Sequence, residues 1–173
     1  MNSASERDVM AFEGVMATGV LPLLLLDWLE IDDTSGPESN VYYVSASILS
    51  HLIPDPCNPS TVLRFLVFNG AINEPFRNLL ERKDPRALIL MVYFYAKVCV
   101  YEDWWLNRRA KVEGEAICLF LEIFHADNQT IQDLLAYPRA VFALLQTSIS
   151  EATQRSTYIL DAANKVPSAR PAQ

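Results

Sequence analysis

A chain of 173 residues, 51% of them apolar, is long enough for one domain with a genuine hydrophobic core. Its formal net charge of −7 repels phosphate backbones, so we do not expect direct nucleic-acid binding. The three cysteines are too few and too scattered for a disulfide framework or a zinc site. We therefore expect an intracellular protein, cytoplasmic or nuclear, with no metal, no cofactor and no membrane span.

The N-terminal part of the sequence predicts a helix followed by a leucine-rich segment. Apolar residues recur at spacings of three and four, which indicates one buried helical stripe. These residues are Val9, Phe12, Met16 and Val20. Leu21–Leu29 is so apolar that we expect it to be buried or to form a contact between two copies of the chain. Glu30–Asn40 is polar and rich in helix breakers, which predicts an exposed loop.

The middle of the chain predicts three further helices. Val41–Leu52 could be a strand by residue type, but its helical neighbours favour a helix. Ile53–Pro59 holds several prolines and is predicted to be a connector. A helix should start at Asn58 and Pro59 and stop near Asn69-Gly70, a strong turn signal. A short helix is expected over Glu74–Arg82.

A central helix is predicted over Pro85–Tyr101. Asp84 is suited to the N-cap, and Pro85 to the first helical position, where its missing N–H costs nothing. Between Ala87 and Tyr101 only Lys97 is charged. A helix this apolar on all sides must be covered on all sides.

The C-terminal part predicts an amphipathic helix over Trp105–Phe124, a loop, and two more helices. Its predicted apolar face comprises Leu106, Ala110, Ile117, Leu121 and Phe124, and its polar face Asn107, Arg108, Lys111, Glu115 and Glu122. Thr130 should cap a short helix that ends near Pro138, where a last helix, Pro138–Asn164, begins. The fold class is therefore all-α: one domain over 1–165 with about seven or eight helices around the central one, then a disordered tail over 166–173.

One feature of the sequence suggests a binding site. Six large aromatic residues lie close together and either fill the core or line an apolar pocket with a few polar anchors. They are Tyr93, Phe94, Tyr95, Tyr101, Trp104 and Trp105. The sequence holds no phosphate-binding glycine loop and no G-x-S-x-G motif. His125 is suited to a role at a helix C-terminus, where a cation is favourable.

The segment Asp84–Leu121 resembles the C-terminal regulatory region of fungal zinc-cluster transcription factors, especially the group similar to the sterol uptake control protein. The resemblance is carried by Pro85–Ala87–Leu88, Ile89–Val100, Trp104–Trp105–Leu106 and the later Leu134–Arg139. It extends over about Phe68 to Leu145. The six cysteines of that family's DNA-binding module are absent. The resemblance implies an all-α regulatory domain that, in sterol-sensing members, holds an apolar ligand among its helices.

Two hypotheses follow. In the first, the chain is a regulatory domain that binds a sterol, a terpenoid or a polyketide-like molecule. The ligand would contact Leu88, Met91, Val92, Tyr95, Trp104, Trp105 and Leu121. In the alternative, the scaffold is a cofactor-independent cyclase or isomerase of fungal secondary metabolism. Its catalytic groups would be Asp103, Tyr95, Arg108 and His125.

Overall fold

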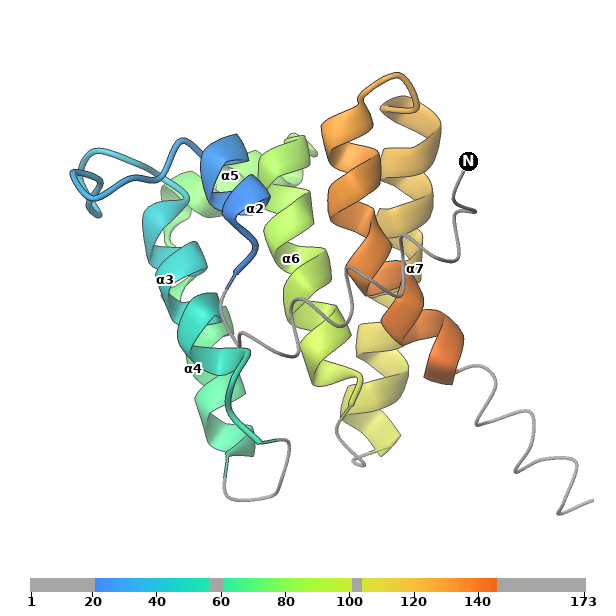
Figure 1. Cartoon of the computed structure of the whole chain (residues 1–173). Helices are drawn as coiled ribbons and strands as arrows, with labels where there is room; N and C mark the ends of the chain where they lie inside the picture. Colours follow the sequence, from blue (N-terminus) through green and yellow to red (C-terminus); the bar gives the residue numbers. More distant parts are fainter. Residues whose placement is uncertain (1–20, 57–60, 101–103, 146–173) are drawn as a thin grey trace, which may run out of the picture. The chain divides into compact units, whose positions relative to one another are not determined.

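The structure, a computed structural model, describes residues 21–56, 61–100 and 104–145. Its contacts divide the chain into two units, 1–142 and 143–173. The helices are α2 (Leu23–Trp28), α3 (Tyr43–Leu52), α4 (Val62–Ala71), α5 (Glu74–Glu81), α6 (Pro85–Val98), α7 (Trp104–Phe124) and a last helix over 129–145 (Figure 1). The fold is all-α, as predicted, and the described residues include no strand. None of the helices in these ranges is long and apolar enough to span a membrane.

Helix α6 is the centre of the fold, as its sequence predicts. The Asp84 carboxylate accepts a hydrogen bond from the Ala87 backbone N–H at 3.0 Å, so the predicted N-cap is confirmed. Every residue from Ala87 to Phe94 is buried, and so is Lys97. Helices α3, α5 and α7 all pack against α6, which is drawn in green in Figure 1. A helix that is apolar all round is thus enclosed by other helices.

Helix α7 approaches the last helix closely because one of its faces carries small residues. Ala110, Gly114 and Cys118 lie one turn apart and are all buried. The ring of Phe142 occupies the place where a Cβ at Gly114 would stand, since that atom would lie 2.3 Å from Phe142 Cζ. Glycine at position 114 therefore permits the close contact.

The predicted break at Pro138 is wrong, because the helix over 129–145 runs through it. Proline removes the N–H that would bind the carbonyl four residues earlier, that of Leu134. The Tyr93 hydroxyl of α6 donates to this carbonyl at 3.0 Å instead. The predicted cap is also wrong, since Asn128 rather than Thr130 accepts the capping bond, from the Ile131 N–H at 3.2 Å.

The remaining predicted elements agree with the structure in part. The predicted helix over Val41–Leu52 is confirmed as α3, and most of the Glu30–Asn40 loop is exposed. Helix α4 continues past Asn69-Gly70 to Ala71, since glycine is tolerated in an exposed helical position at modest cost. The predicted helix around 9–20, the end of the last predicted helix and the tail lie outside the described residues.

The leucine-rich segment Leu21–Leu29 is divided between two environments. Leu21, Leu25 and Leu29 are buried in the core of their own chain. Leu23 is 83% exposed. The oligomeric contact expected for Leu21–Leu29 therefore stays a prediction, and only part of the segment is available for it.

Candidate functional site

The predicted ligand residues lie mostly in the interior. Leu88, Met91, Val92 and Leu121 are all buried. Trp104 and Trp105 form the start of α7, and their side chains lie outside what the structure describes. The predicted pocket beside the two indoles therefore stays a prediction.

Tyr95, named in both hypotheses, connects α6 to α7. Its hydroxyl donates a hydrogen bond to Glu113 Oε2, and Arg109 Nε donates to Glu113 Oε1 at 2.7 Å. Burial raises the pKa of Tyr95, and the bond to Glu113 raises it further. Burial also raises the pKa of Glu113, but the hydrogen bonds from Tyr95 and Arg109 outweigh it, and the net pKa is lowered. The phenol therefore holds its proton and the carboxylate is charged at neutral pH.

The other predicted catalytic residues are not brought together. Arg108 is exposed near the start of α7, and His125 follows the end of the same helix. At a rise of 1.5 Å per residue, they are about 25 Å apart along the helix axis. Such a separation excludes their joint action on one bond of a small substrate. Asp103 lies outside the described residues.

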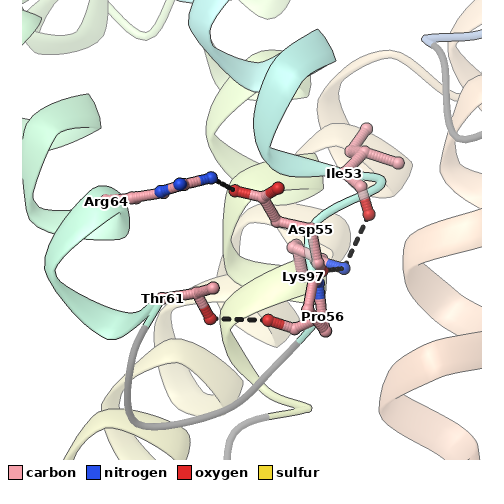
Figure 2. A network of polar contacts seen from close by, with 6 residues as sticks. All are labelled: Ile53, Asp55, Pro56, Thr61, Arg64 and Lys97. Carbon is pink, nitrogen blue, oxygen red and sulfur yellow. Dashed lines mark hydrogen bonds and ion pairs between the residues drawn. The ribbon is translucent and has the colours of Figure 1, made fainter.

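Lys97 is the one charged residue between Ala87 and Tyr101, and it binds backbone carbonyls. Its Nζ donates to the carbonyl of Ile53 at 2.6 Å and to that of Asp55 at 2.8 Å. Figure 2 shows these groups together with the ion pair between Arg64 and Asp55, whose atoms are 2.9 Å apart. The carbonyl end of a helix carries negative partial charge, so an ammonium group at the end of α3 is favourable. Lys97 thereby fastens the end of α3 to α6.

A cavity between α2 and α3 offers a second candidate site. Its volume is about 210 Å³, and it is partly open to solvent. Its walls are mainly apolar, and its lining comprises Leu21, Leu26, Ile31, Tyr43, Ala46, Ser47 and Ser50. We call this cavity the α2–α3 pocket. Nothing local in the sequence signals this cavity.

The polar groups of the α2–α3 pocket are suited to binding rather than to nucleophilic catalysis. Ser50 Oγ donates to the Ser47 carbonyl at 2.8 Å, and His51 Nδ1 lies 2.7 Å from the same oxygen. A carbonyl only accepts, so this His51 nitrogen carries the proton and cannot act as a base toward Ser50. The Ser47 hydroxyl makes no hydrogen bond within the described residues, which leaves it available to a ligand.

A group of aromatic and charged residues connects this pocket to α6. Arg86, in the first turn of α6, pairs with Glu30 at 2.7 Å, and its guanidinium lies 5.6 Å from the centre of the Trp28 ring. The Tyr42 hydroxyl donates to Asp84, the α6 cap, at 3.1 Å. Burial and the nearby Asp84 charge raise the pKa of Tyr42 to about 12. The indole N–H of Trp28 is buried and has no partner in the described part of the chain.

Thiol and metal chemistry find no support in the described residues. Burial raises the pKa of both Cys99 and Cys118 to about 12, so neither is an effective nucleophile at neutral pH. No group of three potential metal ligands lies together in the described ranges. Comparison of the chain with models of protein families, with curated proteins and with solved structures gives no match.

Proposed function

We propose that this protein is an intracellular regulatory domain that binds a small apolar molecule in the α2–α3 pocket. The observation that carries the proposal is the partly open cavity of about 210 Å³ with apolar walls and the free Ser47 hydroxyl. Binding sites of this kind combine apolar walls with a few polar groups that orient the ligand. The resemblance of Asp84–Leu121 to fungal zinc-cluster regulatory regions points to the same class of function.

The size of the pocket narrows the ligand class. Ligand pockets usually enclose about 300–1,000 Å³. A cavity below that range favours a ligand smaller than a tetracyclic sterol, such as a small terpenoid or a short acyl chain. One hydroxyl or carbonyl on the ligand would bind Ser47, and the rest would contact Leu26 and Ile31.

The regulatory step would pass from α2 to α6. Helix α2 and the segment after it contribute Leu26 and Ile31 to the pocket, while Trp28 and Glu30 of the same stretch contact Arg86 at the start of α6. A ligand that separates α2 from α3 would change these contacts. A ligand shifts a conformational equilibrium only by its difference in affinity for the two states. The coupling therefore requires that the bound state change the contacts of Arg86.

A ligand screen against a pocket-filling variant tests this proposal. The wild-type chain should be stabilised in a thermal-shift assay by some members of a panel of small terpenoids and fatty acids, and native mass spectrometry should detect one bound molecule. Ser47→Leu fills the pocket and removes its free hydroxyl, so we expect it to abolish both signals. Ser39→Leu, in the exposed loop, is the matched control and should retain them. Absence of binding across the panel, or binding that survives Ser47→Leu, would refute the proposed site.

The cyclase or isomerase alternative has less support. Tyr95 is bound to Glu113, and Arg108 and His125 lie at opposite ends of α7. No observation on the described residues favours turnover over binding. If a bound terpenoid is recovered chemically changed from the assay, the enzyme hypothesis replaces the regulatory one.

A further inference from the structure

Helix α7 carries an apolar face that the described fold leaves uncovered. Val112, Ala116, Leu119 and Ile123 are all exposed, and their spacings of four, three and four place them along one side of the helix. Val112 is 61%, Leu119 57% and Ile123 62% exposed. We call these four residues the α7 stripe. It lies on the side of α7 opposite the buried residues Ala110, Gly114 and Cys118, of which Gly114 lies against Phe142 of the last helix.

The spacing of the α7 stripe matches the pattern by which two helices pack along a shared seam. Alternating intervals of three and four keep one apolar row on one side of a helix. The stripe covers about 16 Å of helix, or roughly three turns. Single exposed apolar residues are common and require no explanation, but a continuous row of this kind usually marks an interaction surface.

Charge along α7 indicates which partner fits. Arg108 lies just before the stripe and Asp127 just after it, and both are exposed, while the neighbouring Arg109 is paired with Glu113. If a second copy of α7 packs antiparallel on the first, Val112 faces Ile123 and Ala116 faces Leu119. The same arrangement sets Arg108 of each copy opposite Asp127 of the other. A parallel arrangement would instead place like charges together, at a cost in free energy.

We propose that two copies of this chain associate through an antiparallel contact between their α7 stripes, with the Arg108 and Asp127 side chains paired at each end. The contact has twofold symmetry, so each charged pair occurs twice. It uses a surface distinct from the α2–α3 pocket and does not depend on ligand binding.

Analytical ultracentrifugation of the full chain across a concentration series tests the proposal. We expect a reversible monomer–dimer equilibrium in the wild type. Leu119→Glu should weaken association by at least about tenfold, because it buries an unpaired charge at the centre of the contact. Val67→Glu, at a comparably exposed apolar position on α4, is the matched control and should leave the equilibrium unchanged. Circular dichroism should show the same helix content in all three proteins.

A charge-exchange experiment tests the antiparallel arrangement itself. Arg108→Asp alone and Asp127→Arg alone should each weaken the homodimer, because each sets like charges against one another. Mixing the two variants should restore association, since both end pairs of the mixed dimer are then complementary. A structural defect in either variant would not be repaired by mixing.

Three outcomes would overturn the proposal. The wild-type chain could remain monomeric at all concentrations, or Leu119→Glu could dimerise as well as the wild type. Leu119→Glu could also leave the protein monomeric like the wild type while lowering its melting temperature, which would mean that a segment of the same chain covers the stripe.

Discussion

Helices α6 and α7 pack against each other, but they differ in how much of their apolar surface is buried. Helix α6 is apolar on every side and is enclosed by α3, α5 and α7, so its apolar surface is buried within the chain. Helix α7 is apolar on two opposite sides. One side, with Ala110 and Gly114, packs inside the fold, while the α7 stripe remains exposed. Both helices have extensive apolar surface. Whether other helices of the chain bury that surface, rather than how apolar it is, distinguishes a structural surface from an interaction surface.

The largest expected difference is between two leucines, one on each helix. Leu90 of α6 is fully buried, and Leu119 of α7 is 57% exposed. Leu90→Ala should lower the free energy of unfolding by about 2–5 kcal/mol, because it leaves a cavity in the core. Leu119→Ala should change the stability of the monomer by less than about 0.5 kcal/mol. Urea denaturation at low protein concentration measures both, and equal losses would contradict the comparison.

A smaller effect is expected at the packed side of α7. Gly114→Ala would place a methyl group 2.3 Å from Phe142 Cζ and so force the helices to shift. We expect a loss of about 1–3 kcal/mol, as for other overpacked sites. Gly70→Ala, in α4, is the control because nothing lies within 4 Å of its added Cβ. This control should gain about 0.5–1 kcal/mol from its better helix propensity. Similar values for the two variants would show that the inner side of α7 is loosely packed.

A third prediction concerns the bond between α6 and the last helix. Tyr93→Phe leaves the Leu134 carbonyl without the hydroxyl that replaces the missing Pro138 N–H. We expect a loss of about 1–2 kcal/mol, the usual cost of an unsatisfied buried acceptor. In a Pro138→Ala background the backbone N–H returns, so the same Tyr93→Phe change should cost clearly less. A double-mutant cycle on unfolding free energies measures this difference, and additive losses would show that the two residues do not compensate.

The smallest expected effect is a pH dependence at the surface between α6 and α7. The pKa of Glu113 is lowered in the folded protein relative to its ordinary value of 4.5. The ionised carboxylate therefore contributes stability that is present above that value and is lost as the pH falls through the lower folded pKa. Because the pair with Arg109 is well exposed, we expect this contribution to be under about 1 kcal/mol.

Glu113→Gln tests this contribution. The difference in unfolding free energy between wild type and variant should shrink as the pH is lowered from about 7 to about 3. Tyr95→Phe, which removes one of the hydrogen bonds that lower the Glu113 pKa, should show a weaker pH dependence than the wild type. A difference between wild type and Glu113→Gln that is constant with pH would argue against the lowered pKa.

The sequence was a good guide wherever structure depends on neighbouring residues. Asp84 and Pro85 mark the start of α6 because capping is a local interaction, and the apolar run that follows predicts enclosure. The helix break predicted at Pro138 is wrong because of an interaction with a residue far away in the sequence. The carbonyl released by this proline is satisfied by Tyr93, which lies on a helix distant in sequence, and no pattern around Pro138 reveals that partner.

The candidate sites were less predictable for the same reason. The α2–α3 pocket depends on how two helices pack, and its lining residues share no motif. On α7 the periodicity correctly placed Ala110 and Leu121 inside, but it also placed Phe124 there, which is 67% exposed. The outer row of Val112, Leu119 and Ile123 follows the same helical period, so only the packing of the chain reveals which row faces outward.

The unpartnered indole N–H of Trp28 has a practical consequence. Tryptophan emission depends on the polarity and charge around the ring, and this ring lies beneath the Arg86 guanidinium on a helix that lines the α2–α3 pocket. Replacing Trp104 and Trp105 by phenylalanine would leave Trp28 as the one fluorophore of its kind in the chain. Movement of α2 away from α3 would then change the emission wavelength of Trp28. The fluorescence of Trp28 would therefore report on movement of the α2 side of the α2–α3 pocket.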